Sequence, residues 1–558
     1  MTRRRGLQKK FVGLAHILLL SGESARQNLS MVSHSFSLSG NRAFPLRINS
    51  FIMDVLFLYT AVLVLTVLIA LSLRRVQQSW SLPPGPRGLP IIGNLFELNG
   101  HAVYVKALEW TNKYGEDVIS LTTLGHTTVI LNSAQAVSDL FVTRGSNYSD
   151  RPNMPMLVDL VGWNWTFALM RYGPRWKEHR RIFHNQFDVT IDEHRIIQLP
   201  AAHELIRLLE RSPEHFLDHL EHYTARIIMQ RVYGYTFADA MTDPYVLVNK
   251  AASETTSTAT VPGTFMVDTF PILKYVPEWM PGAGFKRIAR EWRLLQETVR
   301  DKPYNMVVEQ QSNGTANPCF VSGCLEDRIN NVSGSLSEDA IKSIAAVVYA
   351  AGSDTNLATL TSFVLAMVLH PEVQKRVQIE LDSVLGGERL PTFEDKEHLP
   401  YFWNVMREVL RWLVVFPFAI PHRAMNADTY KGYHIPANAT VLGNTWAILH
   451  DPEVYPDPEA FKPDRYEAEN VPDPIDYGVF GYGRRSCSGK NMALDTVWIA
   501  MATILSVFDI MKPVDQNGNT ISPKLTFRRS TINHPAPFDC VFKVRSAAAL
   551  TLIQQERD

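Results

Sequence analysis

The residues with the clearest capacity for chemistry lie in the stretch FGYGRRSCSG, Phe480 to Gly489. Cysteine is usually a small buried hydrophobic residue, but Cys487 stands among glycine and serine turn-formers and close to Arg484 and Arg485. Neighbouring cations lower the pKa of a thiol and favour the thiolate, which is the form that attacks electrophiles and binds metals. This setting predicts that Cys487 is a nucleophile, a redox thiol or a metal ligand.

A second candidate site lies at the centre of the apolar stretch 337–370, where residues 350–356 read AAGSDTN. A helix over this stretch would be roughly 50 Å long, and its nearly uniform apolarity is typical of a buried helix. Gly352 costs about 1 kcal/mol relative to alanine in a helix interior, and Asp354 and Thr355 need polar partners if they are buried. The pattern predicts either a functional site or a packing notch that holds a satisfied polar pair.

Charged motifs accompany these two stretches. EVLR puts Glu408 and Arg411 on one helix face, and FKPDRY contributes Arg465 from the proline-rich irregular region 451–478. A loop of that length within a compact domain is usually functional. Each pair alone is commonplace, and the usual interpretation is a surface ion pair.

WKEHRR, residues 176–181, combines an aromatic side chain with several cations. Helical spacing puts Trp176 and Arg180 on one face, and Lys177 and Arg181 on the next. Such a segment is most often a solvated basic helix.

The elements that must position these residues are mostly helical, with small sheets. Residues 117–132 carry β-branched residues on both sides of Leu124-Gly125, which predicts a hairpin. Helices are expected at about 133–143, 174–187, 197–234, 283–310, 337–370, 371–385, 399–413 and 489–508. The expected fold is mainly α with small β-sheets (α+β), in a single large domain.

Composition narrows the possible functions. The 558 residues carry a formal charge of -1, so no general attraction to nucleic acid is expected. Four cysteines are too few for a disulfide framework and favour a reducing compartment. Cys319 and Cys324 lack a second Cys/His pair that would complete a zinc site, so we interpret their polar stretch as a loop.

The N-terminal region predicts a membrane anchor. Residues 55–73 form an uncharged run of 19 residues, close to the roughly 20 needed to span a bilayer. The hinge LPPGPRGLPIIGN follows it. The expected organisation is an extension at 1–52, an anchor at 53–75, a Pro/Gly hinge at 76–94, the main domain at 95–545 and a tail at 546–558.

The extension 1–52 conflicts with that anchor, because it carries eight Lys/Arg residues and one acidic residue. The positive-inside rule would keep it in the cytosol, whereas Arg74 and Arg75 favour the opposite orientation. One hypothesis is that Met53 is the working start; the other is that residues 1–52 contain a signal or transit sequence.

Taken in order, AGSDT, EVLR, FKPDRY and FGYGRRSCSG resemble the motif series of the cytochrome P-450 haem-thiolate monooxygenases. The resemblance covers about residues 53–545, and the anchor and hinge resemble the membrane-bound eukaryotic members. Stretches such as VDTFPILKYVPEWMPGAGFKR resemble fungal enzymes of secondary metabolism. The family implies the P-450 fold, a haem b cofactor and oxidoreductase activity with molecular oxygen.

The resemblance also implies a role for each motif residue. Cys487 would be the axial ligand of the haem iron, with Phe480 packed beside it and glycines letting the backbone pass closely below. Arg485, Trp176, Arg180 and Arg423 would bind the haem propionates. Glu408, Arg411 and Arg465 would form a buried structural network. The cofactor-binding set is therefore Cys487, Arg485, Phe480, Gly483, Gly489, Trp176, Arg180 and Arg423.

Asp354 and Thr355 would be the catalytic pair that delivers protons for the splitting of dioxygen. Asn356 departs from the Thr or Ser that the family commonly has there. The substrate pocket would draw on residues 154–166, on residues 415–420, and on Val347, Ala350, Ala351, Thr531 and Ile532. Their apolar character suits a lipophilic small molecule.

The implied partners are a lipophilic substrate, the membrane and a separate NADPH-dependent reductase, because the chain has no flavin or nicotinamide fingerprint. Lys177, Arg181 and Lys490 are candidates for docking that reductase. The implied location is the endoplasmic reticulum membrane, single-pass, with a cytosolic catalytic domain. The alternatives are a haem-thiolate isomerase, dehydratase or peroxide-using enzyme that needs no reductase, and a non-catalytic haem sensor or binding protein.

Overall fold

The computed structural model describes residues 59–60, 62–64, 66, 82–98, 103–261, 263–527 and 531–555. Contacts divide the chain into two compact units, residues 1–70 and 71–558, and the elements discussed below belong to the second. The predicted extension at 1–52 and most of the predicted anchor at 53–75 lie outside the described residues. Within the described ranges, no single helix combines the length and hydropathy needed to cross a membrane.

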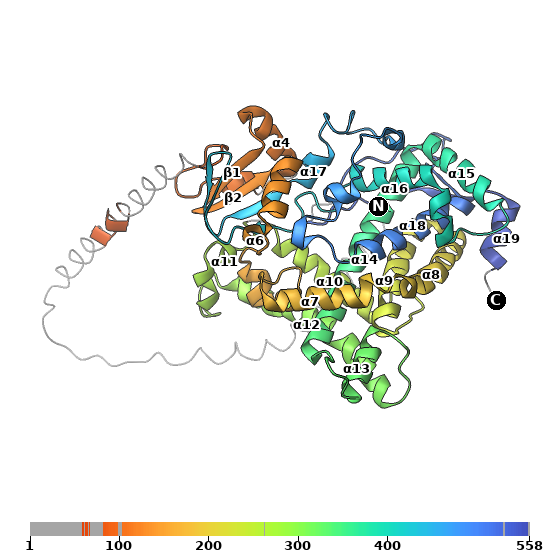
Figure 1. Ribbon diagram of the computed structural model, residues 1–558, viewed down its shortest axis with the longest axis horizontal. Coiled ribbons are helices and arrows are strands. Elements are labelled where there is room, and N and C mark those ends of the chain that lie inside the picture. The colour runs from red at the N-terminus through yellow and green to blue at the C-terminus, as the bar shows by residue number, and fades with distance from the viewer. Residues whose placement is uncertain are drawn as a thin grey trace, which may run out of the picture. The chain divides into compact units, whose positions relative to one another are not determined.

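Helices make up most of the second unit, as the sequence predicts (Figure 1). The shorter ones are α3 Leu95–Leu98, α5 Ala134–Val137, α6 Gly145–Tyr148, α11 Met266–Thr269, α17 Thr445–Leu449 and α19 Ala547–Gln555. The longer ones are α4 Val103–Tyr114, α7 Pro174–Phe183, α8 Ile191–Arg211, α9 Phe216–Tyr233, α10 Pro244–Ala259, α12 Gly284–Ser312, α13 Phe320–Ile329, α14 Glu338–Leu369, α15 Pro371–Leu385, α16 Pro400–Trp412 and α18 Lys490–Val507.

The strands form three small sheets. Their bounds are β1 Val118–Thr123, β2 His126–Leu131, β3 His422–Arg423, β4 Asp428–Tyr430, β5 Tyr433–Ile435, β6 Thr440–Gly443, β7 Phe508–Met511 and β8 Val541–Val544. The largest sheet has the order β1-β2-β6-β3, and β2 and β6 are parallel. The predicted hairpin at 117–132 is confirmed, with β1 and β2 antiparallel and Leu124 and Gly125 at positive φ in the turn.

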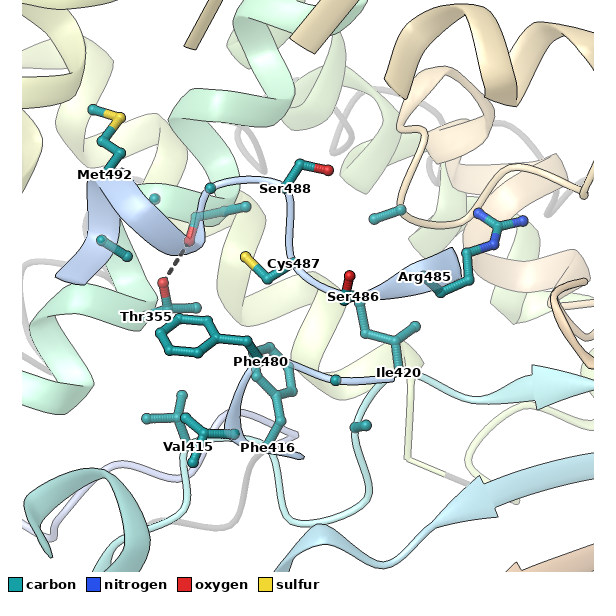
Figure 2. Close-up of a pocket in the computed structure, with 18 of the residues that line it drawn as sticks. Thr355, Val415, Phe416, Ile420, Phe480, Arg485, Ser486, Cys487, Ser488 and Met492 are labelled. Carbon is teal, nitrogen blue, oxygen red and sulfur yellow. Dashed lines mark hydrogen bonds between the residues drawn. The ribbon is translucent and has the colours of Figure 1, made fainter. Parts of the chain in front are cut away.

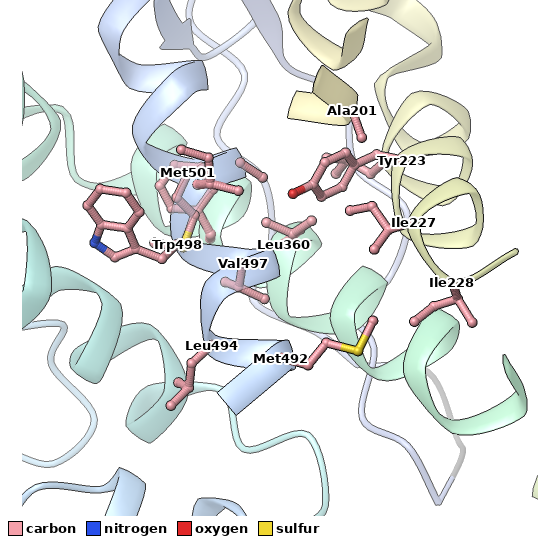
Figure 3. Packing of buried hydrophobic residues seen from close by; sticks show 14 of the residues in the cluster. Ala201, Tyr223, Ile227, Ile228, Leu360, Met492, Leu494, Val497, Trp498 and Met501 are labelled. Carbon is pink, nitrogen blue, oxygen red and sulfur yellow. The ribbon is translucent and has the colours of Figure 1, made fainter. Parts of the chain in front are cut away.

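The helix α14 lies at the centre of the core, where it packs against α9 and α18 (Figure 3). Leu360 is fully buried between these helices. The Tyr223 hydroxyl on α9 donates to the Thr496 carbonyl on α18 over 2.7 Å, which ties these two neighbours together. Gly352 allows α9 to approach closely, because a Cβ there would lie 2.9 Å from the Ile228 Cδ1.

Two local predictions are wrong. The single helix expected at 197–234 is two helices, α8 and α9, because Ser212 leaves helical geometry and Pro213 has no backbone N–H to continue the ladder. The stretch with Cys319 and Cys324 is not a loop but leads into α13. The Cys319 side chain caps that helix, and Cys324 is buried on it.

The irregular chain at 451–478 is held to α16 by a buried charge network. Glu408 and Arg411 are both fully buried, and two Arg411 nitrogens donate to the Glu408 carboxylate over 2.8 Å each. The Arg465 Nε donates to the same carboxylate over 3.1 Å, and Arg411 also donates to the carbonyls of Leu449 and Pro458. The structure therefore brings together the three charged residues singled out in the sequence.

Removing the carboxylate should leave two buried guanidinium groups without their counter-charge. We expect Glu408→Ala to lower the free energy of unfolding by about 3–5 kcal/mol, measured by urea-induced loss of helical circular dichroism. The control is Glu297→Ala, which removes a half-exposed partner of Arg293 and should cost less than about 1 kcal/mol. Equal losses for the two variants would contradict a structural role for the network.

Candidate functional site

Cys487 lies on a tight loop just before α18. The loop is closed by the backbone N–H of Cys487, which donates to the Phe480 carbonyl over 2.7 Å. Gly483 turns the chain with φ +54°, and a Cβ there would lie 2.2 Å from the Phe141 carbonyl oxygen. Only glycine fits that position without a backbone shift. Figure 2 shows Cys487 and Phe480 on this loop, across the cavity from Thr355.

The loop closes one side of a large internal cavity. About 300 Å³ of it is open to the centres of water molecules. The walls come from α7, α14, α18, the cysteine loop and the segment between α16 and β3. No Asp, Glu or Lys residue lines the cavity in the part of the chain that the structure describes.

The Cys487 thiol is exposed to this cavity rather than to bulk solvent. Desolvation raises the pKa of Cys487, although the Gly489 N–H and the Arg180 cation act to lower it. The expectation that nearby cations make this thiol a free thiolate is therefore wrong for the protein alone, because burial outweighs them. A coordinating metal ion deprotonates a thiol outright. Of the three roles left open by the sequence, metal ligand fits best.

Cationic side chains line the wall next to Cys487. Arg485 is buried and donates to the carbonyls of Ser149, Phe167 and Met170 over 2.7, 3.1 and 2.7 Å. Its guanidinium also lies 4.4 Å from the Trp176 ring centroid. These contacts satisfy most of its donors but supply no negative charge.

Two more arginines share this wall. Arg180 donates to the Ser486 carbonyl over 2.7 Å and to the Ser488 hydroxyl over 2.9 Å, which ties α7 to the cysteine loop. Arg151 donates to the carbonyls of Ala168, Ile420 and Pro421 over 2.7 to 2.8 Å.

Burial outweighs the charge of Asp150 in setting the pKa of two arginines of this wall. Burial lowers the pKa of Arg485 to about 10, although Asp150 acts to raise it. Burial, and then the Arg485 cation, lower the pKa of Arg151. The wall therefore favours an anionic group.

Arg423 is the one predicted propionate ligand that the structure does not place at the cavity. Its guanidinium pairs with Asp150 over 2.6 Å and donates to Asn438 over 2.7 Å. The neighbouring His422 lines the cavity instead and is buried. Successive side chains of a strand point to opposite faces, so only one of these two β3 residues can face inward.

His422 and Arg151 are functional candidates that the sequence analysis missed. The His422 Nδ1 is 2.7 Å from the Tyr148 carbonyl oxygen, and the ring stacks on Phe141. Burial and the Arg151 and Arg485 cations lower the pKa of His422, so a carboxylate placed beside it would oppose those effects. The dipeptide HR in IPHRAM was the available signal, but it did not say which residue faces inward.

The opposite wall is formed by the central part of α14. Thr355 lines the cavity, and its hydroxyl donates to the Ala351 carbonyl over 2.8 Å. Asn356 also lines it and donates to the Gly352 carbonyl over 2.9 Å, which confirms that this departure from the family pattern bonds locally. These side chains meet their hydrogen-bonding needs within their own helix.

Asp354 does not line the cavity, although it precedes Thr355. One carboxylate oxygen is 3.1 Å from the His534 Nε2, and the other accepts from the Ser253 hydroxyl over 2.9 Å. Burial acts to raise the pKa of Asp354, but the contacts with His534, Ser253 and Lys250 outweigh it and lower the pKa. The two residues of the predicted pair therefore face different surroundings.

The predicted substrate contacts are recovered in part. Val347, Ala351, Val415, Phe416, Ala419, Ile420 and Ile532 line the cavity. Residues 154–166 do not; they pack on α12, where the Trp165 Nε1 donates to Gln296 over 2.6 Å. Ala350 and Thr531 are also absent from the wall, whereas Phe167, Ile228, Met406 and Leu410 line it without having been predicted.

Comparison with known proteins identifies the class. The family model described as Cytochrome P450 matches residues 83–538. The chain belongs to the cytochrome P450 family and has the P450 fold, with the monooxygenase activity of that family.

The most similar curated relatives are fungal. A cytochrome P450 monooxygenase of Armillaria gallica is 56% identical over 503 residues, which cover 89% of this chain and 99% of the relative. The tryptamine 4-monooxygenase of Psilocybe cyanescens is 40% identical over 86% of this chain and 95% of its own length. Cytochrome P450 monooxygenase 98 of Postia placenta is 39% identical over 87% and 95%.

The family binds haem, and the cavity fits that group. A haem requires a metal ligand, room for a flat macrocycle and cations for two propionate carboxylates. Here a thiol that faces the cavity, a cavity lining without acidic residues in the described chain, and the arginine wall of Arg151, Arg180 and Arg485 occur together. The wall lacks the negative charge that propionates would bring.

Two glycines of the loop give a matched test. Gly483→Ala places a methyl group against the Phe141 carbonyl at positive φ, which adds about 1–3 kcal/mol of strain. We therefore expect its haem content to fall to under about one tenth of that of the native protein. Gly489 has φ −91°, and a Cβ there would meet only Phe183 at 3.8 Å, so Gly489→Ala should keep its haem. The measurement is haem absorbance per purified protein. Similar losses in both variants would contradict this account of the loop.

Proposed function

We propose that this protein is a haem-thiolate monooxygenase that inserts one oxygen atom from dioxygen into an uncharged lipophilic molecule, such as a terpenoid or another secondary metabolite. One observation carries the proposal: Cys487, the buried Arg151 and Arg485, and the half-buried Arg180 face a single cavity that no carboxylate lines in the described chain. Family membership and the fungal relatives support it.

The residues at the cavity divide into those that hold haem b and those that face the substrate. Cys487 would supply the axial thiolate, with Phe480 packed beside it. The propionates would be bound by Arg151, Arg180, Arg485, Trp176 and His422. Arg423 would not take part. Thiolate-ligated haem supplies the capacity to cleave the O–O bond of dioxygen. Thr355 would hold a proton-donating hydroxyl at the cavity, and Asp354 would supply protons to it.

Among the described residues, the substrate side is mostly apolar and carries no acidic group. Ile228, Val347, Ala351, Val415 and Ile532 line it, which suits a ligand bound by burial of apolar surface. One relative is named for tryptamine, a molecule with an amine that is charged at neutral pH. A charged ammonium group would find no carboxylate on this wall, because Asp354 faces away from it. The proposal is therefore an uncharged substrate.

Electrons would come from a separate NADPH-dependent reductase. We further propose that a single N-terminal span holds the enzyme in the endoplasmic reticulum membrane. Lys177 and Arg181 are exposed on α7, on the face next to the buried Trp176. Neither has an ion-pair partner among the described residues. Lys490, the third docking candidate, pairs with Asp476 over 2.6 Å, so we assign docking to the first two.

Isotope labelling tests the reaction. Membranes with this protein and a fungal reductase would be incubated with terpenoids, indoles, sterols and fatty acids under heavy-isotope dioxygen. We expect one labelled oxygen atom in a product, detected by mass spectrometry, and none with Cys487→Ala. A rearranged product without label would instead assign an isomerase or dehydratase. Labelling that persists in Cys487→Ala would refute the proposed ligand.

Charge reversal tests the reductase surface. Lys177→Glu and Arg181→Glu should slow reduction of the haem by the reductase several-fold at low salt, with the difference shrinking as salt screens the charges. The measurement is stopped-flow absorbance after mixing. Lys375→Glu, on the exposed face of α15, is the control. Equal rates in all four proteins would place the docking surface elsewhere.

A further inference from the structure

Asp354 is separated from the cavity it is expected to serve. Its carboxylate lies among Ser253 on α10 and His534 in the segment before β8, while Thr355, the next residue, faces the cavity. The Asp354 side chain is 24% exposed and the His534 side chain is 16% exposed. His534 therefore lies beside the carboxylate, in a position that still reaches solvent.

The segment that carries His534 is fixed on both sides. The backbone N–H of Asn533 donates to the Val415 carbonyl over 2.8 Å, and the Thr531 hydroxyl is 2.6 Å from that of Thr260 at the end of α10. Ile532 lines the cavity. These contacts fix the backbone on the N-terminal side of His534 without using the ion pair with Asp354.

Other charges near the carboxylate are few. Lys250, one turn before Ser253 on α10, favours the ionised form of Asp354 electrostatically but is itself paired with Glu221 over 2.7 Å. The Ser253 hydroxyl donates a hydrogen bond to the carboxylate but carries no charge. Among the described residues, His534 and Ser253 contact the Asp354 carboxylate, and of these two only the imidazole can accept a proton at one ring nitrogen and donate one from the other.

We propose that His534 is the solvent-side donor of a proton path that runs through Asp354 to the Thr355 side of the cavity. The proton enters the imidazole at Nδ1 from solvent and leaves from Nε2 to the Asp354 carboxylate. Rotation of the protonated carboxyl group then carries it toward the cavity. No electron moves in these steps, and the imidazole regains its proton from solvent. The proposal rests on the proposed monooxygenase function.

The competing explanation is that His534 only positions Asp354. Glutamine separates the two, because its amide can donate the same hydrogen bond but cannot pass a proton on. If His534 only positions the carboxylate, His534→Gln should restore what His534→Ala loses. If His534 transfers protons, both variants should fail alike.

The experiment uses the full-length protein in lipid vesicles with an NADPH-dependent reductase, and dioxygen as the only probe. Dioxygen leaves either as hydrogen peroxide, with two electrons and two protons, or as two water molecules, with four of each. NADPH oxidation, oxygen uptake and peroxide release are measured from pH 6 to 9, in light and heavy water. Haem absorbance and the unfolding temperature of each variant are recorded without turnover.

We expect both His534 variants to oxidise NADPH about 10²-fold more slowly, the lower end of what a proton-transfer group contributes. Their solvent isotope effect should rise. Thr355→Ala is the positive reference. His370→Gln is the matched control, since His370 pairs with Glu372 over 3.3 Å at the far end of α14, and it should behave as the native protein does.

Each outcome either supports or overturns the proposed role of His534. A native rate in His534→Gln together with a slow His534→Ala would overturn proton transfer in favour of positioning. Native behaviour in both would overturn any role for His534. If His534→Ala loses its haem, the test depends on His534→Gln alone. The effect of His534→Gln on the rate should then vanish in the Asp354→Asn background, because His534 and Asp354 act on one path. If the native protein with reductase consumes no oxygen, the proposed function fails first.

Discussion

Burial of positive charge without an internal counter-charge is the constraint on which the site depends. A buried guanidinium costs free energy unless it is paired, and Glu408 supplies that pairing for Arg411 and Arg465 in the network behind the cavity. Among the described residues, the guanidinium groups of Arg151 and Arg485 donate to carbonyl oxygens, and burial outweighs the charge of the nearby Asp150 in setting their pKa values. The two groups of arginines differ in what completes them. The protein itself supplies the negative charge for the first group, through Glu408. A ligand that brings carboxylates would supply it for the second group.

The helix α14 belongs to both the core and the site. Leu360 of α14 packs in the dry interior, whereas Thr355 and Asn356 face the cavity one turn away. Polar side chains in such a helix would be costly if they sought partners across the cavity. They donate instead to backbone carbonyls of α14 itself.

What the sequence predicts well is local, and what it misses is set by distant contacts. The cysteine loop, the Glu408–Arg411 spacing and the hairpin at 117–132 follow from short-range rules of turns, helix faces and strands. Which of His422 and Arg423 faces inward depends on how β3 pairs with β6. The orientation of Asp354 depends on α10 and on His534, far along the chain. The pKa of Cys487 was misjudged because burial, which outweighs the nearby cations, comes from the whole fold.

The segment 531–534 shows how the two sides of α14 are connected. Ile532 lines the cavity, and His534, two residues later, contacts Asp354 on the outer side. The Asn533 backbone between them is fixed to Val415, whose side chain is also at the cavity. A substrate that packs against Ile532 and Val415 therefore touches the same short segment that holds the imidazole in place. If His534 supplies protons as proposed, substrate contact and proton supply share one short piece of backbone.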